Sequence, residues 1–482
     1  MKVCPLRNSC TLLLAALCLA AAAGLASCSV GPNYSAPPVD MPGHFKAAAS
    51  QPAVSAAQIR TNWWTLFNDP RLDELEAQAL AGSFDLKAAL ARIDEARAAR
   101  DIVRAGFFPT VNFNPSLMRS RPSANGAPPV TTNNLIQLPL DLNYEVDVWG
   151  KVRRGYEAAD ATYQASIADA AVIRLSLQSN VAVGFLNLRS LDAQEQILIH
   201  YIEQFRHQVD LTERQKRAGM VDQTAVAQAR TQLDSTLPQL QEVRRQRADQ
   251  EHALAVLLGR PPSELSLATD PLTGQQQPPV IPPGLPADLL AHRPDVAEAE
   301  QNLVAANAQI GVAVSAFLPN VQLAASVGYG SVGFGNALQW NNHFWSVGPT
   351  ASVPIFEGGA LVAGLAQARG HYAELMAAYR GVLVGAFRDV EDALNDIRYF
   401  TEESESLDRA IKSAREYARL AEDQYKGGLI NYLTVVDAYR TLLTNELSAA
   451  QTLNQRMAST VLLIKAVGGG CDVRSPAASQ PD

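Results

Sequence analysis

The chain has 482 residues, of which 47% are hydrophobic and 18% are charged, and its formal net charge is −8. This apolar content excludes a chain that is mainly disordered, and the acidic balance argues against a nucleic-acid partner, which requires a basic face for phosphates. Four of the five cysteines lie within the first 28 residues and only Cys471 lies elsewhere, so the sequence does not describe a disulfide scaffold.

The first 27 residues have the features of a bacterial lipoprotein signal peptide. Lys2 and Arg7 supply a positive start, residues 11–23 are apolar but too short to span a bilayer, and Leu25-Ala26-Ser27-Cys28 follows. Cleavage there makes Cys28 the lipid-attachment residue. Because Ser29 is not the Asp that retains lipoproteins in the inner membrane, we expect the outer membrane. The alternative is an ordinary signal peptide followed by an incidental cysteine.

The chain after the signal contains two copies of one pattern. Phe107-Phe108-Pro109 recurs as Phe317-Leu318-Pro319, an offset of 210, and Ala218-Gly219 recurs as Gly427-Gly428, an offset of 209. We also match Val148-Trp149-Gly150 with Ile355-Phe356-Glu357, an offset of 207. Steady offsets over this distance predict a pseudo-twofold duplication rather than a solenoid, which needs more copies.

These matches divide the chain into six regions, and each repeat is expected to hold a helix, two strands and two long helices. The regions are a signal peptide (1–27), a lipid-anchored N-terminal segment (28–68), a first repeat (69–260), a Pro-rich linker (261–286), a second repeat (287–467) and a C-terminal tail (468–482).

Four strands with one apolar face are predicted, near residues 110–119, 134–148, 320–331 and 343–356. In the second strand, apolar residues alternate with polar ones over 13 residues, from Ile136 to Val148. This length exceeds the five or six residues of an average globular strand and suits an outer-membrane β-barrel. The alternative is a soluble sandwich with one buried face.

Four strands cannot close a barrel, because single-chain barrels begin at about eight strands and an open edge cannot face lipid. The membrane interpretation therefore requires a ring of chains. The same ring would wind the long helices into a hollow cylinder.

The long helix of the second repeat is predicted from about Gly359 to Lys426. Its apolar stripe advances by alternating steps of four and three residues, which is typical of a left-handed coiled coil. Such a helix would be about 100 Å long at ~1.5 Å per residue. Gly427-Gly428 ends it, and a second helix follows from about 430 to 467. In the first repeat, Pro238 is expected to kink the second helix.

Several motifs resemble those of the TolC-like outer membrane factor family, specifically its lipoprotein branch of the NodT or OprM type. They are Cys28-Ser29-Val30-Gly31-Pro32-Asn33-Tyr34, Trp63-Trp64-Thr65-Leu66-Phe67-Asn68-Asp69-Pro70, Tyr144-Glu145-Val146-Asp147-Val148-Trp149-Gly150-Lys151-Val152-Arg153-Arg154, Arg293-Pro294-Asp295-Val296, Pro354-Ile355-Phe356-Glu357-Gly358-Gly359 and Gly468-Gly469-Gly470. The resemblance covers nearly all of the chain after the signal.

The resemblance implies an α+β fold: a homotrimeric transmembrane β-barrel, with four strands per chain and 12 in total, that continues into a periplasmic α-helical coiled-coil barrel. It implies an efflux channel in the outer membrane of a Gram-negative bacterium, anchored by lipid, with a large periplasmic portion. It also implies a periplasmic adaptor (membrane fusion) protein and an inner-membrane efflux pump as partners, and the passive export of drugs or other small molecules.

By the same resemblance, a periplasmic gate lies near the second helical turn, at Tyr425, Leu433, Asp437 and Arg440. The spacings of four and three residues put the last three on one helix face. Tyr425 is expected to add a hydrogen bond across the turn. The alternative is an ordinary surface ion pair. Tyr439 departs from the family, which usually has Gln there.

Two other functions remain open, and enzyme chemistry has no support in the sequence. The alternatives are a protein-secretion duct of the same fold and a structural periplasmic lipoprotein without a pore, which would not need alternating strands. The glycine pattern at 328–333 matches GxGxxG, but a loop and not a helix follows it. His200 and His207 share a helix face without a third metal ligand. We therefore expect no catalytic residue, cofactor or metal.

Overall fold

A computed structural model of the chain describes residues 29–38, 45–46, 61–121, 123, 131–272, 278–281 and 292–470. The predicted signal peptide, Cys28 and the tail beyond residue 470 lie outside the described residues, as does part of the predicted Pro-rich linker. The chain divides into two compact units. The first contains residues 1–38, 92–166 and 298–379, and the second contains 39–91, 167–297 and 380–482.

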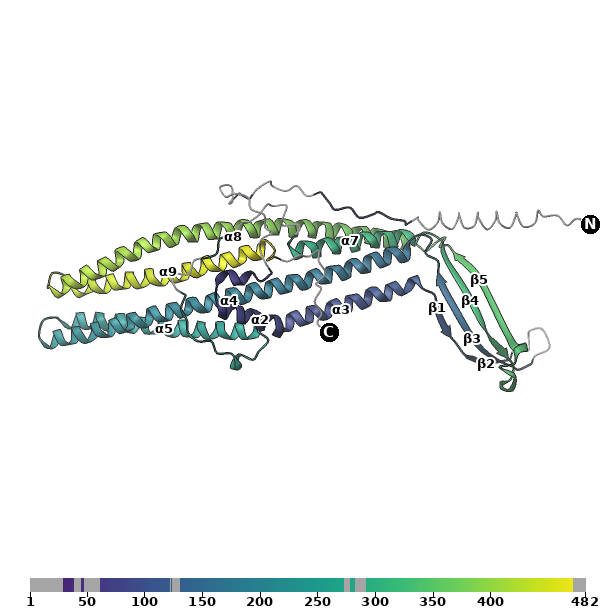
Figure 1. Cartoon of the computed structure of the whole chain (residues 1–482), viewed down its shortest axis with the longest axis horizontal. Coiled ribbons are helices and arrows are strands. Elements are labelled where there is room, and N and C mark those ends of the chain that lie inside the picture. Colours follow the sequence, from purple (N-terminus) through teal and green to yellow (C-terminus); the bar gives the residue numbers. More distant parts are fainter. Residues whose placement is uncertain are drawn as a thin grey trace, which may run out of the picture. The chain divides into compact units, whose positions relative to one another are not determined.

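The first unit contains one antiparallel sheet of five strand segments (Figure 1). They are β1 (Thr110–Phe113), β2 (Ser116–Ser120), β3 (Asn133–Glu145), β4 (Asn320–Ser331) and β5 (His343–Ser352). The sheet order is β1-β3-β4-β5, and β2 continues β1 along β3 in the same register. Pro115, which lacks an N–H for the ladder, lies between β1 and β2 and accounts for the break in the predicted strand 110–119.

The strand register brings the apolar residues of all strands to one face. Leu140 lies opposite Phe113 on one side and Val327 on the other, and Val327 lies opposite Trp345. These four side chains are between 47% and 71% exposed. The predicted alternation is therefore confirmed. The soluble-sandwich alternative is wrong, because a sandwich would bury this face.

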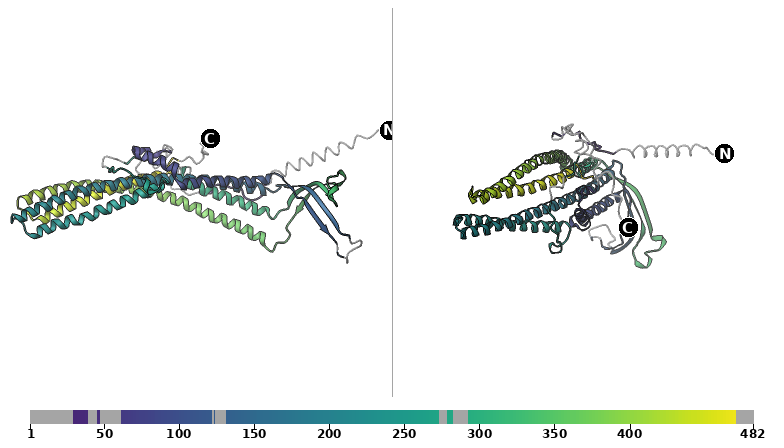
Figure 2. Two further views of the ribbon diagram at one scale, coloured as in Figure 1. Left: turned by 90° about the horizontal axis from the view of Figure 1, so that it is seen from below. Right: turned by 60° about the vertical axis from the view of Figure 1, so that its left-hand side comes forward.

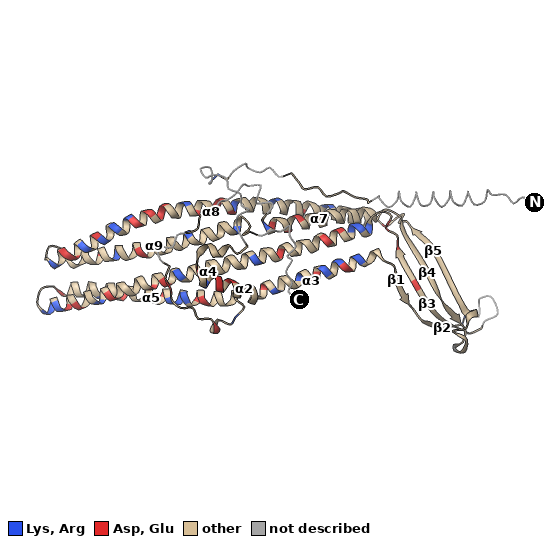
Figure 3. Cartoon of the chain, viewed as in Figure 1, with Lys and Arg blue, Asp and Glu red and all other residues tan. Residues whose placement is uncertain are grey.

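The opposite face of the sheet is polar. Asp141 accepts hydrogen bonds there from Ser326 Oγ at 2.7 Å and from Asn114 Nδ2 at 3.0 Å. Figure 3 shows that charged residues are frequent on the helices and rare on the strands. The two predicted strands that extend to 148 and 356 end earlier, at Glu145 and Ser352.

Two pairs of long helices have matching lengths. The helices are α2 (Pro70–Gly82), α3 (Phe84–Arg104), α4 (Lys151–Arg217), α5 (Gln223–Leu257), α7 (Pro294–Ser315), α8 (Ala360–Lys426) and α9 (Tyr432–Ala466). Both α4 and α8 have 67 residues, and both α5 and α9 have 35. Pro238 lies inside α5 without ending the helix.

Each helix of the second pair begins 209 residues after its counterpart. The offset of 207 that matched Val148-Trp149-Gly150 with Ile355-Phe356-Glu357 is therefore wrong. Gly150 corresponds to Gly359, and both have a positive φ, of 81° and 90°. The positive φ explains why glycine precedes each long helix.

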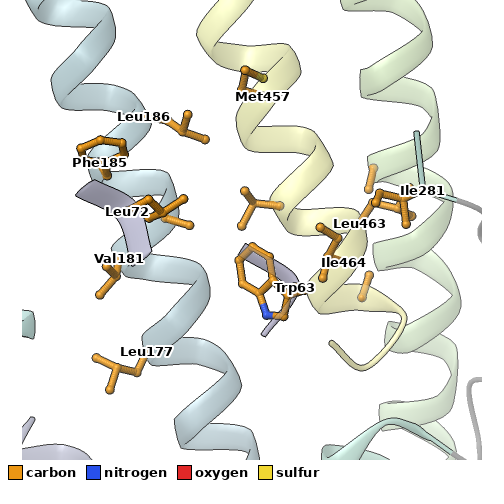
Figure 4. Packing of buried hydrophobic residues seen from close by; sticks show 14 of the residues in the cluster. Trp63, Leu72, Leu177, Val181, Phe185, Leu186, Ile281, Met457, Leu463 and Ile464 are labelled. Carbon is orange, nitrogen blue, oxygen red and sulfur yellow. The ribbon is translucent and has the colours of Figure 1, made fainter. Parts of the chain in front are cut away.

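Two hydrophobic clusters hold the second unit together. Trp63, Leu72, Val181, Leu463 and Ile464 form part of one cluster and are at most 1% exposed (Figure 4). The other cluster contains residues of the predicted stripe of α8 and residues of α4, α5 and α9 along the hairpins, which run side by side (Figure 2). One 18-residue window of α4 has a mean hydropathy of 1.2, but 56% of it is buried inside the protein. We interpret it as a core segment.

Candidate functional site

In both helical hairpins the turn contains a glycine with positive φ after the first helix and an Asn or Asp N-cap before the second helix. Gly428, with φ of +73°, follows α8, and the Asn431 side chain accepts a hydrogen bond from Thr434 N at the start of α9. In the other hairpin Gly219 has φ of +72°, and Asp222 caps α5. An L side chain at either glycine would be strained, so the sequence defines the position of both turns.

Three of the four predicted gate residues lie together on one face of α9. Arg440 Nη2 donates to Asp437 Oδ1 at 2.7 Å, and the two side chains are 66% and 50% exposed. Leu433, one turn earlier, is 52% exposed. Val435 and Ala438 occupy the opposite, buried face of the helix. In a single chain the pair faces solvent and contributes only about 0–1 kcal/mol.

Tyr425 makes a different hydrogen bond from the predicted one. Its hydroxyl donates to Gln215 Oε1 at 2.6 Å, so the bond joins α8 to α4 in the other hairpin and does not cross the turn. Its ring lies 5.4 Å from that of Tyr432. Burial raises the pKa of Tyr425, which keeps the hydroxyl a donor. Tyr425 therefore connects the two tips, while Asp437 and Arg440 face away from the core.

Tyr439, which replaces the Gln expected from the family resemblance, connects the two helices of its own hairpin. Its hydroxyl donates to Glu422 Oε2 at 2.6 Å, and Lys426 lies 2.9 Å from the other carboxylate oxygen. Burial opposes ionisation of Glu422, but these two donors hold its pKa below the usual value. The tyrosine therefore links α9 back to α8 and does not belong to the exposed gate face.

A polar seam between α4 and α9, which the sequence did not reveal, runs along the hairpins. Asn454 Nδ2 donates to Asn187 Oδ1 at 2.7 Å, and Gln451 Nε2 donates to Gln194 Oε1 at 3.3 Å. These amides line a hollow of about 240 Å³. The sequence signal was weak, because amides beside an apolar stripe look like solvent-exposed positions.

The segment that follows Cys28 is fixed to the first unit, although Cys28 itself lies outside the described residues. Val30 N donates to Trp149 O at 3.0 Å, and Asn307 Nδ2 donates to Pro32 O at 2.9 Å. Gly31 has φ of +91°, and a Cβ there would lie 2.5 Å from a backbone atom of α7. This close approach explains the glycine and holds the segment just beyond the end of β3.

Among the described residues, no group of three His, Cys, Asp or Glu side chains could hold a metal ion. His200 and His207 are exposed on α4. The glycine pattern at 328–333 spans the end of β4 and the bend that follows it, and the next element is a three-residue 3-10 helix.

A sheet with one uncovered apolar face and long paired helices with capped tips define the class of outer-membrane channels that extend into the periplasm. The chain belongs to the outer membrane efflux protein family, whose model matches residues 75–260 and 285–469. It is an outer-membrane efflux channel component with a large periplasmic portion. Family members are channels and not enzymes.

Individual relatives agree with this assignment. The chain is 31% identical to the antibiotic efflux pump outer membrane protein ArpC of Pseudomonas putida, over 92% of this chain and 93% of that protein. It is 29% identical to the probable outer membrane lipoprotein SilC of Salmonella typhimurium, over 92% and 96%. The solved structure of the outer-membrane channel OprN matches with a TM-score of 0.87 at 29% identity, over 92% and 99%.

Proposed function

We propose that this protein is the outer-membrane duct of a tripartite efflux system and works as a homotrimer. Each chain would supply four strands to a 12-stranded barrel and two helical hairpins, one from each repeat (69–260 and 287–467), to a periplasmic α-barrel. A periplasmic adaptor and an inner-membrane pump are its partners. The exported molecules are drugs or other small molecules, and the pump supplies the energy.

The observation that carries this proposal is the sheet, which has one exposed apolar face and, among the described residues, no partner strand at either edge. An apolar face suits lipid, but an open edge does not, because its N–H and C=O groups would lack partners there. Closure by further copies of the same four strands satisfies both requirements.

We propose Cys28 as the lipid-attachment residue. The support is the Leu25-Ala26-Ser27-Cys28 sequence and the lipoprotein name of the relative SilC. A single acyl chain gives only marginal membrane binding, so the barrel would supply most of the anchoring.

We propose that Leu433, Asp437 and Arg440, together with the tip contact of Tyr425, form the periplasmic gate. A threefold axis would repeat each side chain three times around an aperture. Three Asp437 carboxylates alone would repel one another, and Arg440 offsets this repulsion. The exposed, uncovered position of the pair on α9 supports this arrangement.

Two measurements test the duct. Native mass spectrometry in detergent should give a mass of three chains, and the purified protein should form discrete conducting channels in planar bilayers. A stable monomer that conducts would contradict the trimer. A trimer that never conducts would favour the structural lipoprotein without a pore.

A further inference from the structure

The two halves of the sheet have the same internal register. Thr110 in β1 lies opposite Asn143 in β3, and Asn320 in β4 lies opposite Ser352 in β5. Asn320 lies 210 residues after Thr110, and Ser352 lies 209 residues after Asn143. The motif repeat gives the same 210 for β1 and β4, and the helix bounds give the same 209 for the following segment.

The chain also shows how the first half joins the second. In the sheet, β3 pairs with β4 so that Asp141 lies opposite Ser326. In the helices of the second unit, α4 contacts α9 through the amide pair of Asn187 and Asn454. In the sheet, β5 and the β1–β2 edge have no strand beyond them within the described residues. On the helices, the residues equivalent to this amide pair, Asp396 on α8 and Arg245 on α5, are exposed.

We infer that a second copy of this chain binds these surfaces by repeating the contacts seen within one chain. In the sheet, β5 would pair with β1–β2 of the partner subunit, with Thr350 opposite Ser116. In the helices, Asp396 on α8 would pair with Arg245 on α5 of the partner subunit. This inference rests on the proposed homotrimer. Thr350 and Ser116 take the places of Asp141 and Ser326. Asp396 and Arg245 take the places of Asn187 and Asn454.

Continued beyond Ser352, where β5 ends, the inferred register places apolar residues opposite apolar residues. Val353 lies opposite Phe113 of the partner subunit, and Ile355 lies opposite Val111 of the partner subunit. In the single chain these four side chains are 48%, 60%, 90% and 56% exposed. A register shifted by one residue would place them opposite the polar face instead. The register inferred from the repeat offsets therefore also pairs apolar residues with each other just beyond β5.

The inferred helix contact replaces two amides by opposite charges. Within the described chain Asp396 has no hydrogen bond or ion pair, and partial burial together with Asp392 raises the pKa of its carboxyl group. Arg245 is 60% exposed and contacts Glu242 and Asp249 of its own helix. Exposed pairs of that kind are weak, and a guanidinium has five N–H donors, so it can serve a further carboxylate.

The next pair along the seam would bring two carboxylates towards each other. With the same offset of 209 residues, Glu403 corresponds to Gln194, and Glu242 of the partner subunit corresponds to Gln451. Each carboxylate already has a donor within its own chain, because Thr452 Oγ1 donates to Glu403 at 3.0 Å and Arg245 Nη2 donates to Glu242 at 2.6 Å. Arg245 would therefore lie among the carboxylates of both subunits and offset their repulsion.

Cysteine cross-linking tests the strand register. In a Cys471→Ser background, Thr350→Cys with Ser116→Cys should give covalent trimers on a non-reducing gel. The two residues lie on opposite edges of the sheet, so a bond within one chain is excluded. Ser120→Cys is the matched control, four residues and about 13 Å along the strand. Stronger linking of Thr350→Cys to Asn114→Cys or Met118→Cys would overturn the inferred register.

Charge exchange tests the helix contact. Asp396→Arg and Arg245→Asp should each lower the temperature at which the trimer dissociates, and the double exchange should recover most of the loss. Asp408→Arg lies 12 residues further along α8, about 18 Å away at ~1.5 Å per residue, and should not rescue Arg245→Asp. Equal, additive losses in all combinations would refute the ion pair.

Native mass spectrometry of the unsubstituted protein distinguishes a failure of the proposed homotrimer from a failure of the inferred subunit contacts. Absence of a trimer contradicts the proposed function itself. A trimer that neither forms the 116–350 link nor shows charge rescue leaves the duct intact and overturns the inferred subunit contacts.

Discussion

At the scale of single residues, Glu76 is the most unusual side chain in the second unit. It lies in α2, is 0% exposed, and neither carboxylate oxygen has a hydrogen-bond partner in the described part of the chain. The surrounding cluster is apolar and includes Leu72 and Ala79. Burial, with a smaller effect of Asp73, raises the pKa of Glu76 to about 9, so the folded protein holds this group protonated at neutral pH.

We predict that Glu76→Gln stabilises the protein much more at pH 8 than at pH 5. A carboxyl group has a pKa of about 4.3 when unfolded, so folding takes up a proton, and the free energy of unfolding falls as the pH rises from about 4.3 towards 9. Glutamine removes that penalty, which is about 5 kcal/mol at pH 8 and about 1 kcal/mol at pH 5. Urea unfolding in detergent at both pH values measures it.

Glu74→Gln is the matched control, because Glu74 lies on the same helix and is 56% exposed. It should change stability little at either pH. A Glu76→Gln gain that is equal at pH 5 and pH 8 would show that the effect comes from packing and not from protonation.

Arg293, in the Arg-Pro-Asp motif, connects three helices of the second unit. Its guanidinium donates to Ala466 O at 2.9 Å, at the end of α9, and to Asp295 at 2.6 Å, at the start of α7. Asp389 in α8 lies 3.3 Å away. The side chain is 10% exposed. One planar donor group therefore satisfies a helix carbonyl and two carboxylates at once.

We predict that Arg293→Ala lowers the free energy of unfolding by about 2–3 kcal/mol, because Ala466 O loses its side-chain donor and the partly exposed carboxylates of Asp295 and Asp389 each lose one of their donors. Arg293→Lys should recover only part of this loss. Arg388→Ala, which removes a 70% exposed arginine from the same Asp389, is the control and should cost at most about 1 kcal/mol. Similar losses for Arg293→Ala and Arg388→Ala would contradict the bridging role.

At the scale of elements, the sequence predicts periodic structure well and long-range contacts poorly. The strands 133–145 and 320–331 and the long helices follow from periods of two and of 3.5, which the backbone geometry dictates. The partner of Tyr425 could not be predicted in this way, because Gln215 is 210 residues away in the sequence. Pairing between hairpins depends on how the helices pack and not on local pattern.

The gate prediction belongs to this scale, because it concerns the exposed face of α9. Replacing Asp437 and Arg440 together by Ala should raise single-channel conductance and make cells leakier to large antibiotics. The reason is that each pair is weak alone, but three around a narrow, partly desolvated aperture reach a few kcal/mol, about the scale of partner binding. Trimer assembly should be unchanged.

Ala substitution of Glu416 and Arg419, another exposed pair three residues apart, on α8, is the control and should leave conductance as it is. If the Asp437 and Arg440 double variant conducts no better than the unsubstituted protein, the constriction lies elsewhere. We would then test the first-repeat turn at Asp222.

At the scale of the whole molecule, membrane attachment has two expected sources, the lipid at Cys28 and the barrel. We predict that mass spectrometry of protein from its native membrane finds an acylated Cys28 at the N-terminus, and that Cys28→Ser, exported with a cleavable signal, still fractionates with the outer membrane. An unmodified Cys28 in the native protein would refute the anchor. A soluble Cys28→Ser protein would refute the barrel as the main attachment.

The unpaired edges of the sheet also have a consequence for biogenesis. A lone subunit suits neither water, where its apolar face is exposed, nor lipid, where its strand edges lack partners. The sheet can therefore be completed only when several chains associate, and the rate of assembly depends steeply on the local concentration of subunits. At low expression, newly exported subunits should accumulate as protease-sensitive intermediates, and the yield of mature channels should rise faster than in proportion to synthesis.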